Sequence, residues 1–437
     1  LTQGFMQAYP SPTRSSSGLM FASEIASPNP IALLPVPARH TPLYNSRINT
    51  MSSSPLTARV LQLNSRLQGG GTDTQSLALS RGLSHLGWTI EVAGPIDAPL
   101  SPSAQKFGFH PLPRFRPHQI FTLAGVLRRT KPRILHAHHG DDYWTALLAS
   151  RLVEPRPLVI FSRHLAKSPR SPVSRKHLFA QADAVIAVSS FVAQVLLQGH
   201  DDPASPVAER HHRPSCTIAP QKLHVIHTGI DTALFRPMDS SFASAARHRL
   251  SLNKNELVFG VVGGFDLPVG KGQRVFLKAA QMIVRRLPQA RFLLAGSGTM
   301  EALLRDDIHH LGLEDRARLI GQQPDPVSLH HAIDCLVHPQ IATEAFPSVV
   351  LEAHACGRPV LASELDGIPE AWSIGKLGQL VRAGDAGALA QAMVAFSENP
   401  GLTHDERTAA HTRVASQASQ PVQAQRVADL YRRLMAR

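Results

Sequence analysis

The chain lacks long apolar segments and has few cysteines. None of its apolar runs approaches the ~18–20 residues that a membrane-spanning helix needs. No basic segment followed by an apolar stretch indicates a secretory signal. Its three cysteines, Cys216, Cys335 and Cys356, lack metal-ligand spacing and favour a reducing compartment. We therefore expect a cytoplasmic protein, with peripheral attachment to the inner face of the membrane as a further expectation.

Aromatic residues make up only 5% of the sequence, and they do not alternate with basic residues. A base-stacking platform for nucleic acid is therefore disfavoured. Positive charge, in contrast, is in excess: residues 1–235 hold 23 Lys and Arg against 12 Asp and Glu, whereas residues 236–437 hold 22 against 20. We expect the first half to attract an anionic membrane surface or an anionic or lipid-linked acceptor, the alternative being an unspecialised basic surface.

The length of 437 residues fits two domains of ordinary size. Residues 1–56 are rich in Ser and Pro, show no helical or strand periodicity, and are expected to be disordered. Met51 stands just ahead of the first expected strand, so we expect the physiological start there.

From Arg59 onward, short apolar runs alternate with helical segments. Strands are expected at 60–63, 89–93, 134–137, 157–161, 184–188, 222–226, 258–264, 291–295, 317–320, 335–337 and 360–362. Helices are expected at 72–86, 118–130, 172–181, 272–286, 300–311, 386–396 and 419–435. This βα order is typical of doubly wound parallel sheets, and a polar, proline-rich loop over 200–221 separates the two halves. The sequence thus predicts an α/β protein with two Rossmann-like domains, 57–221 and 222–400, facing a cleft, and a helical segment over 401–437.

The most informative local pattern is a pair of glutamates, Glu344 and Glu352, with a helix start between them. Pro347 suits a first helical position, and Gly357 followed by Pro359 indicates the helix end. Unpaired N–H groups at such a helix start favour an anion. The segment therefore fits a phosphate flanked by two carboxylates that accept hydrogen bonds from hydroxyls, as a nucleotide-sugar requires. Solvated glutamates on a surface helix would show the same spacing.

Two further clusters follow expected strands. The run Gln68-Gly69-Gly70-Gly71-Thr72 opens a helix, where glycines let backbone N–H groups approach a ligand, although an ordinary βα turn would look alike. The run His136-Ala137-His138-His139 ends a buried strand, and its spacing is not that of a strong metal site. Gly270-Lys271-Gly272 is not a P-loop, because Phe265 replaces the first glycine and no Ser or Thr follows the lysine.

The segment from Glu344 to Ser363 closely resembles the Glu-x7-Glu signature of glycosyltransferase family four, the group-one glycosyltransferases. The resemblance extends from about residue 58 to about residue 437. It implies the GT-B fold, in which the last helix crosses back to the first domain. The segment Val225 to Asp231 resembles the interdomain signature of that family, and we interpret it as structural.

The resemblance also implies roles for individual residues. Glu352 would bind the ribose hydroxyls, Glu344 the hydroxyls of the donor sugar, and Lys271 the diphosphate. His138, with His136 as second choice, would contact the transferred sugar. The implied catalytic residues are His138, Glu344 and Lys271. The implied donor-binding residues are Gly70, Gly71, Gly264, Lys271, Ala345, Phe346, Pro347, Ser348 and Glu352.

Two positions depart from the family pattern. Gly264 stands where the family usually has an arginine, so one of two phosphate-binding cations is missing, and Arg274 is a candidate replacement. Ala345 stands where the family commonly has glycine, a milder change.

We therefore predict a retaining glycosyltransferase that moves a sugar from a nucleotide diphosphate donor to an acceptor held mainly by the first domain, in the synthesis of envelope polysaccharide, lipopolysaccharide or glycolipid. No Asp-x-Asp occurs in the chain, so neither a metal nor a cofactor beyond the nucleotide-sugar substrate is indicated. A catalytically weak sugar-nucleotide-binding protein, a GT-B epimerase and a nucleic-acid-binding protein are the alternatives.

Overall fold

The structure is a computed structural model, and it describes residues 58–169, 171–201 and 212–437. These residues belong to one compact unit that begins at Ser54. The predicted disorder of residues 1–56 and the predicted start at Met51 lie outside the described residues.

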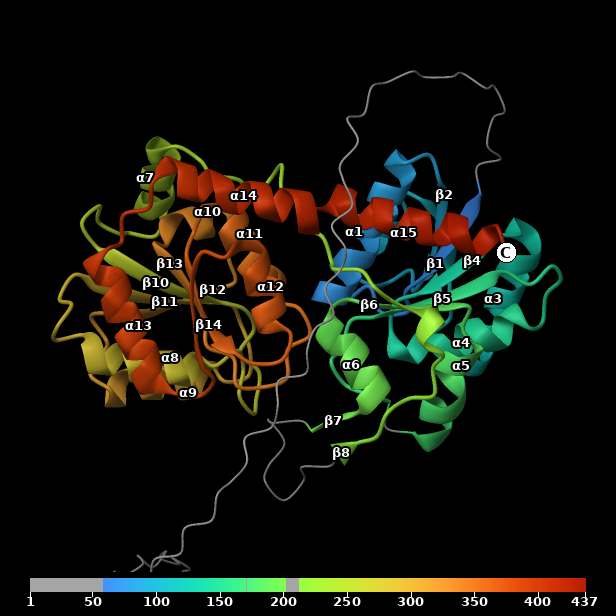
Figure 1. The fold of residues 1–437 in the computed structure, drawn as a ribbon, viewed down its shortest axis with the longest axis horizontal. Helices are drawn as coiled ribbons and strands as arrows, with labels where there is room; N and C mark the ends of the chain where they lie inside the picture. Colours follow the sequence, from blue (N-terminus) through green and yellow to red (C-terminus); the bar gives the residue numbers. More distant parts are fainter. Residues whose placement is uncertain (1–57, 170, 202–211) are drawn as a thin grey trace, which may run out of the picture. The chain divides into compact units, whose positions relative to one another are not determined.

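The first sheet has seven parallel strands in the order β3-β2-β1-β4-β5-β6-β9 (Figure 1). The strands are β1 (Arg59–Leu63), β2 (Thr89–Gly94), β3 (Gly108–Pro111), β4 (Ile134–Ala137), β5 (Leu158–Arg163), β6 (Ala184–Ala187) and β9 (Leu223–Val225). The helices are α1 (Gly71–His85), α2 (Ser101–Ala104), α3 (Arg116–Thr130), α4 (Gly140–Ser150), α5 (Phe179–Gln181) and α6 (Ser190–Gln198). This order confirms the doubly wound topology predicted for the first half.

Four short elements, η1, β7, β8 and η3, complete the first half. The basic helix predicted over 172–181 is a π-helix, η1 (Ser174–Leu178), that runs into α5. In the segment predicted as a long loop, β7 (His200–Asp201) and β8 (His212–Arg213) form a short antiparallel pair, and the 3₁₀-helix η3 (Pro220–Lys222) follows. The next strand, β9, pairs with β6, so residues 223–225 extend the first sheet although we placed them in the second domain.

The second sheet has six parallel strands in the order β12-β11-β10-β13-β14-β15. Its strands are β10 (Leu257–Val262), β11 (Ala290–Ala295), β12 (Ala317–Gly321), β13 (Cys335–His338), β14 (Val360–Glu364) and β15 (Gly378–Arg382). Its helices are α7 (Ser240–Arg249), α8 (Gln273–Ile283), α9 (Glu301–His310), α10 (Pro326–Ala332), α11 (Ser348–Ala355), α12 (Ile368–Gly375) and α13 (Ala386–Glu398). The four central strands, β11, β10, β13 and β14, are largely buried on both faces and therefore read as nearly continuous apolar runs.

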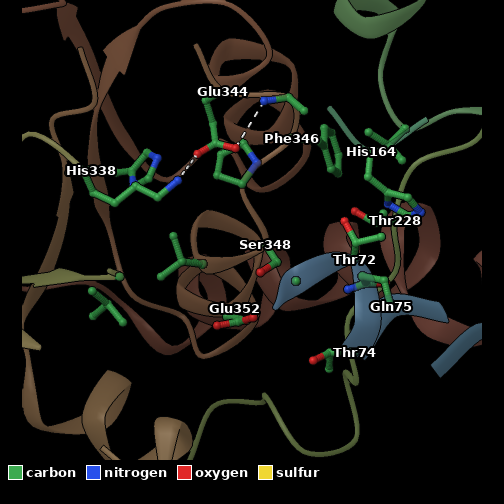
Figure 2. Close-up of a pocket in the computed structure, with 18 of the residues that line it drawn as sticks. Thr72, Thr74, Gln75, His164, Thr228, His338, Glu344, Phe346, Ser348 and Glu352 are labelled. Carbon is green, nitrogen blue, oxygen red and sulfur yellow. Dashed lines mark hydrogen bonds and ion pairs between the residues drawn. The ribbon is translucent and has the colours of Figure 1, made fainter. Parts of the chain in front are cut away.

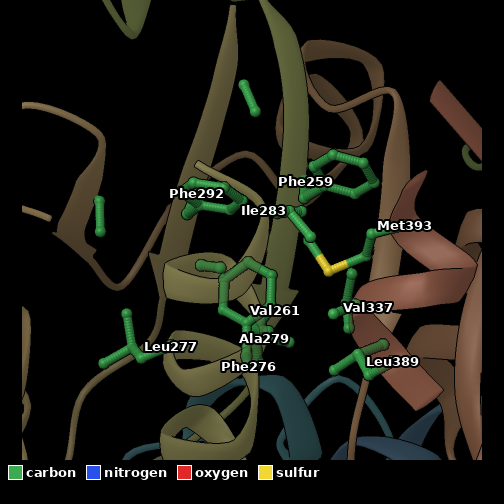
Figure 3. Close-up of a cluster of buried hydrophobic side chains, with 14 of the residues drawn as sticks. Phe259, Val261, Phe276, Leu277, Ala279, Ile283, Phe292, Val337, Leu389 and Met393 are labelled. Carbon is green, nitrogen blue, oxygen red and sulfur yellow. The ribbon is translucent and has the colours of Figure 1, made fainter. Parts of the chain in front are cut away.

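Helices α8 and α13 cover one face of the second sheet and close its largest apolar cluster (Figure 3). Phe259 and Phe292, from neighbouring strands, stack with ring centroids 6.2 Å apart, and Phe276 of α8 meets Phe292 edge-on. Met393 of α13 is fully buried in the same cluster. This packing fixes the direction of α8, whose N-terminus follows Lys271.

In both sheets the strand order reverses between the first and fourth strands, β1 and β4 in one and β10 and β13 in the other. Ligands of doubly wound folds bind at this switch point, beyond the carboxyl ends of the strands. The loops after these four strands are therefore where a binding site is expected.

Two chain segments cross together between the sheets. Ile230 donates its N–H to the carbonyl of Ala418, and Gln420 donates to the carbonyl of Ile230. A side chain at Gly229 would place its Cβ 2.4 Å from the carbonyl oxygen of Ser419, so only glycine fits at this crossing. The structural interpretation of the 225–231 segment agrees with these contacts.

The C-terminal segment consists of two helices that meet at Ser419. Helix α14 (His404–Ala418) packs on α11 and α12 of the second domain, whereas α15 (Gln420–Met435) packs on α1 of the first (Figure 1). Tyr431 of α15 is fully buried, and its hydroxyl lies 2.6 Å from Nδ1 of His136 on β4. The predicted return of the last helix to the first domain is confirmed. In the described part of the chain, no helix combines the length and apolar character needed to cross a bilayer.

Replacing Tyr431 by Phe would leave Nδ1 of His136 buried without a partner. We expect the free energy for opening α15 to fall by about 1–3 kcal/mol, the usual cost of an unsatisfied buried polar group. Hydrogen exchange of amides 420–435 measures this change. Tyr143→Phe is the matched control, because it removes a buried hydroxyl that donates to the carbonyl of Ser162 and does not touch α15. Unchanged exchange in Tyr431→Phe would show that apolar contacts alone hold the helix.

Candidate functional site

A cavity of about 560 Å³ lies among the loops at the carboxyl ends of the two sheets (Figure 2). We call it the donor cavity, after the predicted donor-binding residues that line it. Eight of the predicted site residues line it: Gly71, Lys271, Glu344, Ala345, Phe346, Pro347, Ser348 and Glu352. They come from the first turn of α1, the loop before α8 and the segment before and within α11, three segments that the family resemblance implied for one site.

A second cavity of about 370 Å³, the adjoining cavity below, holds two other predicted residues, Gly70 and His138. It shares Gly71, Thr72 and His164 with the donor cavity, so the two are continuous at these residues. The structure thus places His138 beside the donor cavity and not in its wall. Its predicted contact with the transferred sugar stays a prediction.

Lys271 and Glu344 form an ion pair in the donor cavity, with Nζ 2.5 Å from Oε2. The other oxygen of Glu344 accepts the N–H of Ala345 at 3.2 Å. Burial alone would raise the pKa of Glu344, but the charge and hydrogen bond of Lys271, the charge of His338 and the N–H of Ala345 together lower it. Glu344 is therefore a charged hydrogen-bond acceptor in a fixed orientation and a poor proton acceptor.

The start of α11 faces the donor cavity. Pro347 occupies the N-cap, one position before the predicted place, and no side chain caps the helix. Ser348 begins the helix, and its first N–H groups lie at the cavity wall. Glu352, one turn further on, points to the same space and lies 3.5 Å from Nε2 of His330. An anion at the helix start and hydroxyls near Glu352 would both be accommodated.

Arg274 does not replace the phosphate-binding arginine that the family usually has at the position of Gly264. That side chain forms a two-pronged ion pair with Asp307, with N–O distances of 2.7 and 3.1 Å, and does not line the donor cavity. Gly264 itself lines neither cavity. A Cβ built at Gly264 would meet only the carbonyl oxygen of Ser297, at the ordinary contact distance of 3.6 Å, so the backbone there accepts a side chain's first atom without a clash.

His136, the second choice for the sugar contact, has a structural role. Its two ring nitrogens bond to Tyr431 and to Ser162, at 2.6 and 2.8 Å, and burial lowers its pKa to about 3. His138 donates from Nε2 to Oε1 of Gln62 at 2.7 Å, which leaves its buried Nδ1 without a partner in the described protein. His138 is thus the histidine of this pair that has an atom available to a ligand.

Several residues at the site were not predicted. His338, the last residue of β13, lines the donor cavity, is almost fully buried, and has no hydrogen-bond partner for either ring nitrogen within the described ranges. His164 follows β5 and lines both cavities. Both follow the rule that polar residues at strand ends face the cleft, and His164 was missed because its strand was expected to end at residue 161.

Thr228 also lines the donor cavity, and its neighbour His227 stacks on Phe346 with ring centroids 4.7 Å apart. His227 donates from Nε2 to Glu370 at 2.7 Å. The interdomain segment that we interpreted as structural therefore also contributes to the wall of the site.

Two Rossmann-like domains with a site between the carboxyl ends of their sheets define the GT-B class of protein. Two family profiles match the chain: Glycosyltransferase Family 4 over residues 69–234 and Glycosyl transferases group 1 over residues 244–413. The chain belongs to this family, the group-one glycosyltransferases of family four.

Among its relatives are D-inositol 3-phosphate glycosyltransferases. The protein of Mycobacterium sp. (strain JLS) is 29% identical over 293 residues, which are 60% of this chain and 60% of the relative. That of Mycobacterium avium (strain 104) is 30% identical over 309 residues, 63% of this chain and 65% of the relative. The chain thus spans less than two thirds of the length of these relatives.

Solved structures share the fold at lower identity. A glycosyltransferase from Rickettsia africae ESF-5 has a TM-score of 0.74 and 19% identity, and covers 87% of this chain and 99% of its own. Anabaena HepE in complex with UDP and glucose has a TM-score of 0.70 and 21% identity, and covers 86% of this chain and 100% of its own. These likenesses confirm the predicted GT-B fold.

The buried histidines of the site predict a pH dependence of stability. Burial lowers the pKa of His338 to about 4 and that of His164 to about 3, whereas a histidine in the unfolded chain titrates near 6.5. Between pH 6.5 and about 4 the unfolded state therefore binds more protons, and the free energy of unfolding falls as the pH falls. Each such histidine contributes a slope of about 1.4 kcal/mol per pH unit.

Urea unfolding between pH 6.5 and 4.5 measures this slope. We expect His338→Gln to reduce it by about 1.4 kcal/mol per pH unit. His309→Gln, which changes a histidine with a side chain 77% exposed, is the control and should leave it unchanged. An identical slope in wild type and His338→Gln would mean that His338 is not held neutral.

Proposed function

We propose that this protein is a glycosyltransferase that uses a nucleoside diphosphate sugar and retains the anomeric configuration. The observation that carries the proposal is the convergence of Lys271, Glu344, Glu352 and the start of α11 on one cavity. A cation and free helix N–H groups suit a diphosphate, and two carboxylates suit sugar and ribose hydroxyls.

The nucleoside diphosphate would lie with its ribose at Glu352 and its sugar at Glu344. Lys271 and the N–H groups of Ser348 and Val349 would stabilise the charge that develops on the leaving diphosphate. Preorganised stabilisation of this kind is often the largest catalytic contribution. Because Anabaena HepE was solved with UDP, UDP and UDP-glucose are the first probes for the donor.

The pairing and ionisation of Glu344 and the position of Glu352 favour a transfer that retains the anomeric configuration. An inverting transfer needs a base that removes the proton of the acceptor hydroxyl. Glu344 is paired with Lys271 and its pKa is lowered, so it is a poor base, and Glu352 lies on α11, where we place the ribose. In a retaining transfer without a separate base, the leaving diphosphate can accept that proton.

The proposal also covers the need for a metal and the nature of the acceptor. Lys271 and the helix N–H groups would hold the diphosphate without a metal, and no further cofactor is needed. The basic first half would bind an anionic or lipid-linked acceptor at the inner face of a membrane, in envelope polysaccharide, lipopolysaccharide or glycolipid synthesis.

Lys271→Ala should lower the transfer rate by about 10²–10³, the usual loss when a donor to transition-state charge is removed. Arg274→Ala is the matched control, because this neighbouring cation is occupied by Asp307, and its rate should be unchanged. Calorimetry with nucleoside diphosphates and sugar transfer to an acceptor panel measure the effects, and NMR of the product gives its anomeric configuration.

Each alternative has its own outcome in this experiment. Nucleotide binding without transfer would identify a sugar-nucleotide-binding protein, and conversion of the free nucleotide-sugar to its epimer would identify an epimerase. Inversion of the anomeric centre would contradict only the retaining mechanism and would leave the proposed glycosyltransferase activity standing. Absence of binding to any nucleoside diphosphate, with tight and salt-sensitive binding to DNA or RNA, would overturn the whole proposal.

Gly264→Arg should tighten binding of the nucleoside diphosphate, because it restores a cation where the backbone accepts a side chain's first atom without a clash. A hydrogen bond to a charged group is worth about 1.5–3 kcal/mol, so the dissociation constant should fall by about tenfold or more. Calorimetry compares this variant with Gly264→Gln, which has a long side chain without charge. Equal affinities for the two variants would show that residue 264 does not reach the phosphates.

A further inference from the structure

A further cavity, of about 580 Å³, lies in the second domain away from the donor cavity. Leu257, the first residue of β10, lines this cavity, whereas Val262, the last residue of the same strand, lines the donor cavity. The two ends of this six-residue strand lie roughly 17 Å apart, at about 3.3 Å for each step. The two cavities share no lining residue. The further cavity is therefore a separate space at the amino ends of the strands, and we call it the amino-end cavity.

The walls of the amino-end cavity come from α7, the start of α14 and the segments that lead into β10, β13 and β14. Figure 1 shows the start of α14 beside α7. The charged side chains that line the cavity are the basic residues Arg247, Lys254, Arg358 and Arg407 and the acidic residues Asp239, Glu256 and Asp334. The attraction of this cavity for an anion depends on which of these charges the protein itself pairs.

One of the four cations is neutralised within the protein. Asp334 accepts a terminal nitrogen of Arg247 at 2.5 Å and the N–H of Val258 at 2.8 Å. The other terminal nitrogen of Arg247 donates to the carbonyl of Glu256 at 3.0 Å. Arg247 and Asp334 therefore form a satisfied ion pair in the wall of the cavity.

The remaining carboxylates of the cavity do not pair with the remaining cations. Glu256 forms its ion pair with Arg291 at 2.8 Å, and Arg291 does not line the cavity. Asp239 caps the start of α7 by accepting a backbone N–H. In the described part of the chain, three cations of the cavity thus have no carboxylate within ion-pair distance.

Arg358 is the most buried of these three cations. It follows α11 and is only 7% exposed. One terminal nitrogen donates to the carbonyl of His331 at 3.2 Å, whereas its buried Nε has no partner in the described protein. Burial and the nearby charge of Arg407 lower the pKa of Arg358 to about 10, so the guanidinium is still charged at neutral pH. A buried charge without an anionic partner is costly, which points to an anionic ligand.

Arg407, near the start of α14, lies beside Arg358. A Cβ built on Gly357, the residue before Arg358, would lie 2.7 Å from the Cβ of Arg407. The side chain of Arg407 is partly exposed and has no hydrogen-bond partner among the described residues. Two guanidinium groups therefore lie close together without a carboxylate of the described protein between them. An anion bound between them would relieve their repulsion.

The unpaired charges suit an anion that carries more than one negative charge. A phosphate monoester has a charge of about −1.5 to −2 at neutral pH and three acceptor oxygens, and a planar guanidinium can bind it with two parallel hydrogen bonds. A carboxylate has one charge and two oxygens. The cavity is larger than a phosphate, and the polar side chains of Ser240, Asn255 and Gln289 also line it, which suits hydroxyl groups attached to the phosphate.

We propose that the amino-end cavity binds a small phosphorylated molecule, whose phosphate lies between Arg358 and Arg407 and whose hydroxyl groups face the polar lining. Lys254 supplies a third positive charge on the exposed side of the cavity. No residue of this site takes part in the proposed transfer, so the site does not depend on the proposed function.

Calorimetry on the full chain at constant ionic strength tests this site. Inorganic phosphate and ribose 5-phosphate are the probes, and ribose is the uncharged control. We expect the wild type to bind both phosphates and not ribose. Lys271→Ala, which lacks the cation of the donor cavity, should retain this binding, because the two cavities share no lining residue.

Arg407→Gln should weaken the binding of both phosphates by about tenfold or more, because it removes a charged hydrogen-bond donor. This variant should fold, since Arg407 is partly exposed and unpaired in the described protein. Arg358→Gln should weaken binding at least as much, and Arg407→Gln decides the test if Arg358→Gln fails to fold. Arg285→Gln is the matched control with unchanged affinity, because Arg285 is an exposed arginine of the same domain that lines neither the amino-end cavity nor the donor cavity.

The proposal is overturned if neither phosphate binds the wild type, or if Arg407→Gln binds both phosphates as tightly as Arg285→Gln does. A lower melting temperature of Arg358→Gln with unchanged phosphate affinity would also overturn it, and would make Arg358 a purely structural support for the carbonyl of His331. Loss of phosphate binding in Lys271→Ala would place the ion in the donor cavity, against the proposal. Failure of the proposed function, seen as absence of nucleoside diphosphate binding, would leave the amino-end site standing.

Discussion

The contact of Glu370 with the start of α6 is the interaction on which the geometry of the site depends. Glu370 belongs to α12 of the second domain, and its oxygens accept the N–H of Ser190 at 2.9 and 2.8 Å and that of Phe191 at 3.3 Å. Burial would raise the pKa of Glu370, but the hydrogen bonds from His227 and Ser190 lower it. A charged carboxylate therefore caps a helix of the other domain, where the helix dipole favours it, and this joins the two sheets at their carboxyl ends.

Apolar packing beside this contact fixes the start of the glutamate segment. Ala345 lies in a cluster with Val188 and Val192 of the first domain, and its carbonyl accepts the hydroxyl of Ser189 at 2.8 Å. The alanine that departs from the family pattern thus has its methyl group buried in the interdomain contact. Because Glu344 directly precedes it, the first domain helps to orient a carboxylate of the second.

The repeating βα order was sufficient to predict the central strands of both sheets, since strands buried on both faces stand out as apolar runs, but it missed the partly exposed edge strands β3 and β15. The sequence could not predict that β9 joins the first sheet, because pairing between β6 and β9 depends on contacts across a long intervening segment. The glutamate segment stood out by its spacing and the glycine loop by its place after a strand, whereas Lys271 was implied only by the family resemblance. His338, His164 and Arg163, which lines the adjoining cavity, were not predicted, because the two strands end one or two residues later than expected: His338 and Arg163 are the last residues of β13 and β5, and His164 follows Arg163. A small error in a strand boundary hides the orientation of the side chains there.

Under the proposed function, the charges of the donor cavity give a reason why glycine in place of arginine at residue 264 would affect donor binding. Lys271 contributes one positive charge, and the starts of α1 and α11 contribute roughly half a charge each. Glu344 and Glu352 offset this sum, so the empty cavity is close to neutral while a nucleoside diphosphate brings further negative charge. Under the proposed function, charge attraction alone would therefore be insufficient, and hydrogen bonds from ligand hydroxyls to the two carboxylates would supply much of the affinity. Such bonds are directional and less sensitive to salt than a cation-rich phosphate site, and they favour an intact nucleotide-sugar over a bare phosphate.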